Sequence, residues 1–161
     1  MTPSFYLIVA VLSLALFSTP GDAVAGETAE PASLWYSAPT TDQSSAQRRP
    51  WVIRERDIIL DVQLLQILKD ATARPQPRMT VEFFDANRHE LDITSTVSRF
   101  NDTAVLRGSF KPPSQGDFTL VATRNLLVGS LQVGDHFYKT EHVGNGRLKL
   151  LEVDPRKMPP E

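Results

Sequence analysis

The sequence predicts a mainly β protein, an antiparallel β-sandwich or partly open barrel of about seven or eight short strands with one α-helix. Apolar and polar residues alternate through most of the chain after residue 78, as in half-buried strands. The segments between these stretches are short and rich in Gly, Asn, Asp and Pro, the residues of tight turns. Only one substantial stretch has helical spacing, so one helix is expected to cover an end or edge of the sheet.

The first 25 residues are organised like a secretory signal peptide. A 12-residue apolar run, Tyr6 to Phe17, is followed by turn-forming and small residues, and we expect cleavage between Ala25 and Gly26. The run is shorter than the roughly 20 apolar residues that cross a bilayer. We therefore predict a secreted or periplasmic protein. Because no Lys or Arg precedes the run, an uncleaved N-terminal anchor stays an alternative.

Three regions follow the predicted signal peptide. Residues 26–50 are rich in Ala, Ser, Thr, Pro and Gln, which predicts a flexible leader, because this composition buries too little apolar surface to offset the entropy of ordering. Its only apolar cluster is Leu-Trp-Tyr at 34–36, where we expect a local contact on the domain surface. Residues 51–155 form the predicted β-rich domain, and residues 156–161 a C-terminal linker stub.

A strand and the helix open the β-rich domain. Residues 51–60 are strand-like, and Asp61 then provides a helix N-cap, because its carboxylate can accept hydrogen bonds from the first backbone N–H groups. Pro75 and Pro77 exclude a continuation of the helix. The residues predicted on its apolar face are Leu64, Leu65, Leu68 and Ala71.

Seven further strands are predicted downstream. They cover residues 79–84, 89–97, 103–110, 117–124, 126–133, 136–143 and 147–153. The first two form a predicted hairpin whose residues on one face are Met79, Val81 and Phe83, then Leu91, Ile93 and Val97. Parallel pairing is not expected, because most connections are too short for a crossover.

Charge and cysteine content exclude several classes of partner and site. The chain has 17 Lys and Arg and 19 Asp and Glu, and loss of residues 1–25 removes only Asp22, which leaves a net charge of −1. A nearly neutral chain with dispersed charge lacks the basic patch that binds nucleic acid or an anionic membrane surface. There are no cysteines, so we predict no disulfides, no thiol nucleophile and no thiolate zinc ligand.

No pattern in the sequence predicts catalysis, a metal site or a cofactor. The three histidines are His89, His136 and His142, and the last two lie six residues apart, about 20 Å along a strand. The HExxH, G-x-S-x-G and phosphate-loop spacings do not occur. A Ser/His/Asp triad can assemble from distant positions, so a small hydrolase with a dispersed site stays an alternative.

Residues 116–161 carry spaced Gly, Tyr and acidic residues that end in Asp-Pro and Pro-Pro-Glu. The positions are Gly129, Tyr138, Gly144, Gly146, Glu152, Val153, Asp154, Pro155, Pro159, Pro160 and Glu161. This pattern resembles the end of the N-terminal pro-region of secreted bacterial zinc metalloproteases of the reprolysin-like kind. Upstream segments similar in kind extend the resemblance to about residues 51–161. The protease domain with its HExxH motif is not in this sequence.

The resemblance implies a non-catalytic domain that acts as a folding chaperone or inhibitor of a zinc metalloprotease domain, in cis or in trans. Without cysteine, a block on the protease zinc requires a carboxylate. Asp135 and Asp154 are the candidates, although a hairpin turn and an extended Asp-Pro exit are their ordinary roles. The alternative is a stand-alone periplasmic binding or adaptor module that shares only the fold.

Overall fold

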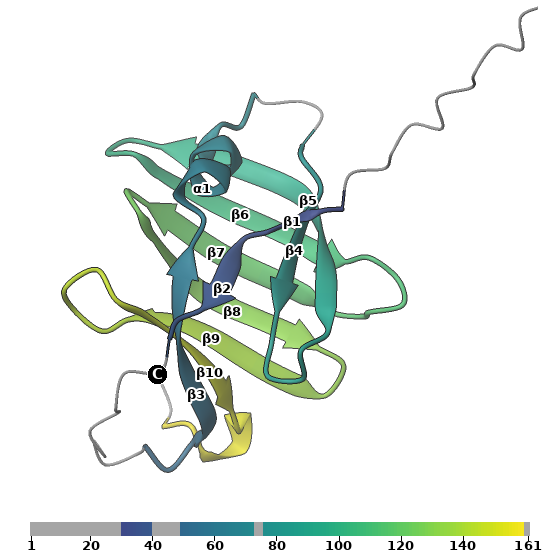
Figure 1. Ribbon diagram of the computed structural model, residues 1–161, viewed down its shortest axis with the longest axis vertical. Helices are drawn as coiled ribbons and strands as arrows, with labels where there is room; N and C mark the ends of the chain where they lie inside the picture. Colours follow the sequence, from purple (N-terminus) through teal and green to yellow (C-terminus); the bar gives the residue numbers. More distant parts are fainter. Residues whose placement is uncertain (1–29, 40–48, 73–75, 160–161) are drawn as a thin grey trace, which may run out of the picture.

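The computed structural model describes residues 30–39, 49–72 and 76–159. In these ranges the chain forms ten strands, one α-helix and one 3-10 helix (Figure 1). The elements are β1 (Ala32–Ser33), β2 (Trp35–Ser37), β3 (Val52–Leu60), α1 (Val62–Lys69), β4 (Met79–Glu82), β5 (Arg88–Arg99), β6 (Thr103–Phe110), β7 (Asp117–Thr123), β8 (Leu126–Val133), β9 (His136–His142), β10 (Leu148–Val153) and η1 (Pro155–Lys157).

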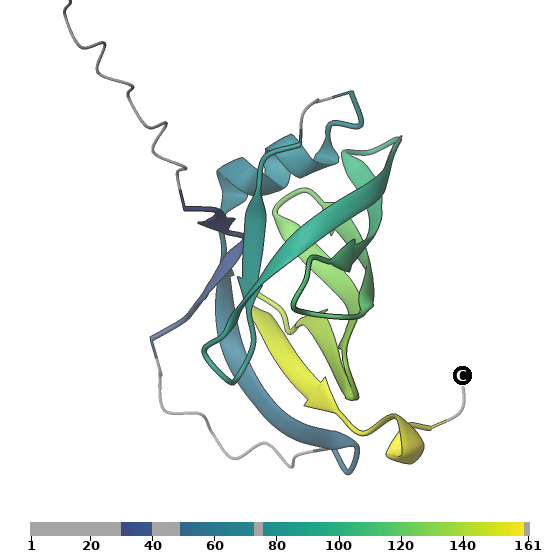
Figure 2. The same cartoon turned by 90° about the vertical axis from the view of Figure 1, so that its right-hand side faces the viewer.

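All ten strands belong to one sheet that curls into a nearly closed barrel (Figures 1 and 2). The strand order is β1-β4-β5-β6-β7-β8-β9-β10-β3-β2, and β5 to β10 form a meander of antiparallel neighbours. The predicted mainly β class, with a partly open barrel and one α-helix, is confirmed. Eight strands correspond to the predicted ones, and β1 and β2 are additional.

Residues 32–37, which we call the strap, close the barrel. β1 pairs in parallel with β4 over two residues, and β2 pairs antiparallel with β3 over three. Between them, the Leu34 N–H donates to the Thr80 carbonyl at 2.8 Å, and the Leu34 carbonyl accepts from the Asp61 N–H at 2.9 Å. One short segment therefore hydrogen-bonds to both edges of the sheet.

The prediction of a flexible leader is wrong for the strap. Leu34 and Trp35 are fully buried in the core, and Trp35 Nε1 donates to the Glu82 carbonyl at 2.9 Å. The prediction relied on the average composition of the leader and so missed these two side chains. Burial of each contributes about 1.5–3 kcal/mol to the stability of the fold. Residues 26–29 and 40–48 of the leader lie outside the described ranges.

The parallel pair of β1 and β4 also departs from the expectation of antiparallel pairing. That expectation rested on short connections between consecutive strands. β1 and β4 are instead separated in the sequence by β2, β3 and α1. A stretch of this length can cross between two strands that run in the same direction.

The predicted N-cap and helix are confirmed, with an earlier C-terminal end. Asp61 Oδ1 accepts from a first-turn backbone N–H at 3.0 Å, and α1 then covers Val62–Lys69. Ala71 lies beyond the helix, because Asp70 Oδ1 accepts from the Thr72 N–H at 2.8 Å and favours a turn instead. The buried residues of the predicted apolar face are Leu65 and Leu68. No helix in the described ranges is both long and apolar enough to cross a membrane.

A β-bulge in β5 changes which residues face the core. The register with β6 shifts between Ile93 and Ser95, and the extra residue reverses the alternation beyond it. Val97, predicted on the core face, is therefore 46% exposed. Of the residues predicted on the core face of this hairpin, those that are fully or almost fully buried are Met79, Val81, Phe83 and Leu91.

Candidate functional site

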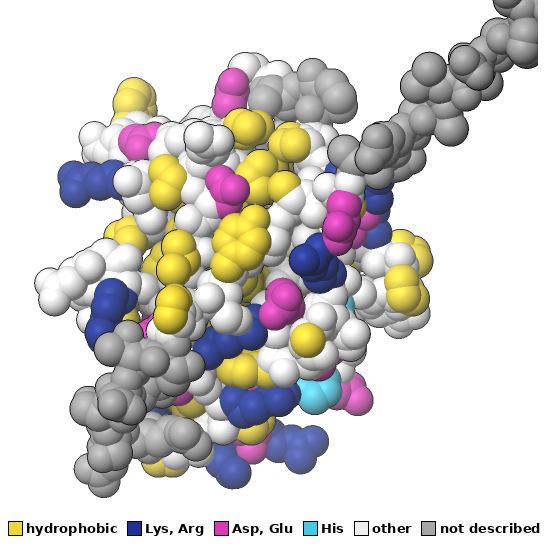
Figure 3. Space-filling model, viewed as in Figure 1, with side chains coloured by type: hydrophobic (Ala, Val, Ile, Leu, Met, Phe, Trp, Pro, Cys, Tyr) yellow, Lys and Arg dark blue, Asp and Glu magenta, His cyan; other side chains and the backbone are white. Residues whose placement is uncertain are grey.

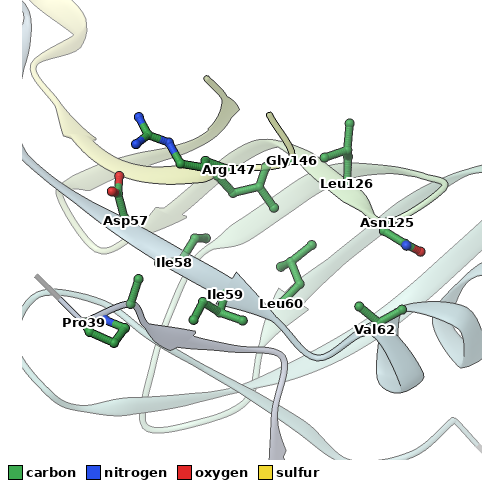
Figure 4. A pocket seen from close by; sticks show the side chains of 12 residues that line it. Pro39, Asp57, Ile58, Ile59, Leu60, Val62, Asn125, Leu126, Gly146 and Arg147 are labelled. Atoms are coloured by element: carbon green, nitrogen blue, oxygen red, sulfur yellow. The ribbon is translucent and has the colours of Figure 1, made fainter. Parts of the chain in front are cut away.

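A groove lies at the end of the barrel where β3 extends past its neighbour β10 (Figure 4). The first residue of β10, Leu148, pairs with Ile58, so Ile59 and Leu60 have no partner in β10. Ala38 and Pro39 after β2, together with residues of the turn before β10 and of the β7–β8 turn, form the rest of the walls, and the volume is about 520 Å³. The groove thus exists because β3 is longer than the strand beside it.

The groove continues into an exposed apolar surface. Ile59 is 53% exposed, and Val62, at the start of α1, is 43% exposed. Tyr36, the register partner of Ile59 in β2, is 52% exposed. Figure 3 shows apolar side chains gathered over β2, β3 and α1 on this face. We call the groove together with these three side chains the apolar face; contiguous exposed apolar surface of this kind marks binding sites.

Polar groups lie at the two ends of the groove. Asp57 and Arg147 are at one end, and Asn125 is at the other (Figure 4). Asp57 Oδ1 is buried and accepts no hydrogen bond from the described residues. This oxygen is shielded from solvent, so a donor on a bound molecule reaches it only if the surrounding residues move. The groove therefore offers an apolar floor, with a guanidinium group at one end and an amide at the other.

A charged cluster occupies the opposite end of the barrel. The Glu152 side chain, 5% exposed, accepts from Arg54 Nε at 2.5 Å and lies 2.8 Å from His136 Nδ1. Burial acts to raise the pKa of the Glu152 carboxyl, but the hydrogen bonds from Arg54 and His136 outweigh it and hold the pKa below its ordinary value. Glu152 is therefore an ionised carboxylate with both oxygens engaged.

Aromatic rings pack around this cluster. The Tyr138 ring stacks on Phe83 with centroids 4.0 Å apart. The guanidinium groups of Arg54 and Arg56 lie 4.9 and 5.3 Å from the centre of the Phe84 ring. Burial raises the pKa of Tyr138 to about 12, so its hydroxyl is protonated at neutral pH. Paired charges and stacked rings indicate that this end holds the barrel together, whereas the groove end is open.

Several positions of the pro-region resemblance meet in the barrel wall. Tyr138 and Glu152 are register partners in β9 and β10. A Cβ atom on Gly129 would lie 2.2 Å from the Thr119 carbonyl oxygen, so this position accepts only glycine without a shift of the backbone. Further matching positions lie in the β9–β10 turn, at the end of β10 and in or after η1: Gly144, Gly146, Val153, Asp154, Pro155 and Pro159. Pro160 and Glu161 lie outside the described residues.

The two candidate carboxylates for a zinc block differ in their contacts. Asp135 is exposed in the β8–β9 turn and makes no hydrogen bond or ion pair with other described residues. Asp154 caps η1: its Oδ1 accepts from the Arg156 N–H at 3.0 Å, and its Oδ2 lies 3.4 Å from Lys157 Nζ. Asp154 is thus engaged within the chain, and Asp135 is free.

Ala25 and Gly26, the predicted cleavage site, lie outside the described residues. His136 and His142 lie at opposite ends of β9. Within the described ranges, no group of three or more His, Asp and Glu residues is placed to hold a metal ion.

His89 lies between a hydroxyl and a carboxylate, an arrangement that the sequence left open. Its Nδ1 is 2.8 Å from Ser114 Oγ, but its Nε2 is 3.9 Å from Asp85 Oδ2, beyond hydrogen-bond distance. Asp85 Oδ2 instead accepts from the Asn87 amide at 2.8 Å. Burial lowers the pKa of His89, which favours the neutral imidazole. A Ser/His/Asp triad requires a carboxylate that orients the imidazole, and Asp85 does not do so here.

The residues of the apolar face were not predicted as a site. One signal for them is present in β3, where Ile59 follows Ile58 and precedes Leu60. Three consecutive apolar residues in a strand place at least one on the outer face. Asp57 and Arg147 meet this surface only through the fold, because they are 90 positions apart in the sequence.

No family model, curated protein or solved structure matches this chain. The resemblance to metalloprotease pro-regions therefore stays a prediction from the sequence pattern. Function has to be inferred from the apolar face and its surroundings.

Proposed function

We propose that this protein is an exported, non-catalytic binding domain whose apolar face docks on a zinc metalloprotease domain, as a folding chaperone or as an inhibitor. The observation that carries the binding function is the groove of about 520 Å³ beside the exposed Tyr36, Ile59 and Val62. The protease as partner comes from the sequence resemblance alone. The predicted signal peptide supplies the secreted or periplasmic location.

Burial of the apolar face favours association. Its three exposed side chains keep roughly half of their surface in water, and each Å² of apolar surface removed from water contributes about 25 cal/mol. A stable interface takes about 800 Å² from each partner, which is more than a groove of this size supplies. We therefore expect the groove to hold one anchoring side chain, with β2, β3 and α1 covered around it.

The polar groups of the groove define the chemistry of that anchor. An apolar side chain of the partner fits the floor of the groove. Arg147, exposed at one end of the groove, suits a carboxylate or a carbonyl. An extended segment of the partner, with an apolar residue next to an acidic one, combines these features.

One way for the domain to inhibit the protease is to bind its zinc ion through a carboxylate that has no other contacts. Asp135 meets that condition, whereas Asp154 would have to give up its contacts with Arg156 and Lys157. If a carboxylate blocks the zinc, Asp135→Asn relieves inhibition while binding persists. If the domain instead covers the cleft, the substitution has no effect on inhibition.

The test mixes the mature domain with the catalytic domain of the secreted zinc metalloprotease encoded nearest to this chain. Peptidase activity and the refolding yield of the denatured protease are measured against domain concentration. We expect at least one of them to change, and the double substitution Tyr36→Ser, Ile59→Ser to remove the effect. Val97→Ser is the matched control, because Val97 is similarly exposed but lies on β5, away from the apolar face.

The other outcomes of this test identify the alternatives. No effect of the unmodified domain on activity or refolding contradicts the protease partner and leaves a stand-alone binding or adaptor module. Ester or peptide turnover by the isolated domain that is lost on Ser114→Ala would instead favour a small hydrolase. An equal loss of effect in the Val97 control would contradict the apolar face as the docking surface.

A further inference from the structure

The strap pairs with both of its neighbours over few residues. It meets β4 over two residues and β3 over three, and β4 itself meets β5 over three. The other neighbouring strands, from β5 round to β3, pair over five to eight residues. The anchor of the strap is the buried pair Leu34 and Trp35. The β1–β4 pair is the shortest in the sheet, so opening of the barrel between these two strands breaks the fewest backbone pairs.

An opened barrel has a defined shape. Opening exposes the Thr80 carbonyl and the Asp61 N–H, which are hydrogen-bonded to Leu34 while the strap is in place. It also exposes the Glu82 carbonyl, which accepts from Trp35 in the closed barrel. It also leaves a hole in the core with the size of a Leu and a Trp side chain. These groups fit an extended segment with Leu followed by Trp, and a second copy of this chain carries that segment.

We propose that two copies of the chain exchange straps, so that residues 32–37 of each complete the barrel of the other. The exchanged dimer keeps every contact of the strap, which makes exchange a low-cost route to association. Residues 40–48 connect strap and barrel, contain no large apolar side chain, and can span up to about 30 Å. This length allows a strap to reach a neighbouring molecule.

Exchange also changes the composition of the apolar face. Tyr36 belongs to the strap, whereas Ile59 and Val62 belong to the barrel body. In the exchanged dimer each apolar face therefore combines a tyrosine from one copy with two aliphatic residues from the other. The proposal depends on the pairing of the strap and not on the identity of any protease partner.

Single cysteines can report where a strap docks, because the natural chain has none. Tyr36 and Ile59 are register partners on the outer surface, and Cα atoms of paired antiparallel strands lie within disulfide range. Full-length mature Tyr36→Cys and Ile59→Cys chains with different tags are mixed at high concentration and gently oxidised. We expect a mixed disulfide dimer at least about ten-fold above random collision, because docking raises the local thiol concentration.

Two controls separate strap exchange from other contacts between copies. Ile53→Cys replaces Ile59→Cys in one mixture; Ile53 lies on the same strand with similar exposure but is not paired with Tyr36. A chain with both Tyr36→Cys and Ile59→Cys, oxidised as a monomer, holds its own strap in place. We expect this locked chain to stay monomeric in size-exclusion chromatography under conditions where the natural chain dimerises.

Either of two results overturns the proposal. Equal yields from the Ile59 and Ile53 mixtures would mean that the disulfides arise from collision. Equal dimerisation of the locked and natural chains would mean that copies associate face to face without exchange. Thermal unfolding of each variant checks that it is folded, and substitution of exposed side chains leaves the core intact.

Discussion

The two ends of β3 are built in different ways. Towards its beginning, Arg54 pairs with the buried carboxylate of Glu152, and aromatic rings pack over the charges. At its other end, Ile59 and Leu60 extend past β10, and an apolar groove remains. One strand thus joins a closed end to an open one.

The difference between the two ends of β3 indicates which residues stabilise the fold and which are available to bind a partner. Paired charges and stacked rings at the closed end stabilise the fold through contacts within the chain. The open end instead keeps apolar surface exposed, which a partner can cover. Substitutions at the closed end should therefore lower stability, and substitutions on the apolar face should change binding.

The largest effect is expected beneath the open end. Trp35→Ala removes a fully buried side chain next to the apolar face and should lower the free energy of unfolding by about 3–5 kcal/mol. Tyr36→Ala, one residue along on the outer face, should change it by less than about 1 kcal/mol. Urea unfolding of both variants measures the contrast. Equal losses would show that the open end does not depend on the buried anchor of the strap.

A smaller effect is expected at the closed end. Glu152→Gln should cost about 1–2 kcal/mol at pH 7, because the carboxylate loses charge-assisted hydrogen bonds while Arg54 and His136 stay solvated. The pKa of Glu152 is lowered by folding, so its contribution is present above its unfolded pKa and is lost as pH falls through the lower folded value. The difference between natural and variant chains should therefore shrink in acid.

Unfolding measured from pH 7 down to pH 3 tests this expectation. Glu141→Gln is the control, since Glu141 pairs with Arg49 at the surface, where ion pairs contribute about 0–1 kcal/mol. A stability difference for Glu152→Gln that stays constant with pH would contradict a folded-state carboxylate held ionised by its partners.

Asp154 and Asp135 should differ less in their contribution to stability than the pairs compared above. Asp154→Ala removes the cap of η1 and should cost about 1 kcal/mol. Asp135→Ala removes a free carboxylate and should be within about 0.5 kcal/mol of the natural chain. Thermal unfolding of the two variants compares them, and a larger loss for Asp135 would mean that its turn relies on the side chain.

The smallest stability effect is expected for the apolar face itself. Ile59→Ser exposes no core residue and should shift the free energy of unfolding by about 0.5 kcal/mol or less, while binding to a partner falls sharply. Leu60→Ser, at the next position, faces the core and should cost several times more. If both substitutions destabilise equally, Ile59 is part of the core and the open end is not free to bind.

Local signals in the sequence were sufficient for much of the fold. Alternation predicted the strands from β3 to β10, and Asp61 predicted the start of α1, because both patterns act between residues close in the chain. The position of Val97 was missed, since the bulge in β5 depends on its register with β6. Leu34 and Trp35 were missed because their burial depends on β3 and β4, not on their neighbours in the sequence.

By itself the sequence determined the mainly β class, the one α-helix of the described residues and the lack of disulfides, since periodicity, capping and composition are local properties. Only the tertiary structure decided that the strap closes the barrel, that Glu152 meets Arg54 and His136, and that a groove stays open beyond β10. Each of these depends on strand order and register between distant parts of the chain. No pattern within one segment contains that information.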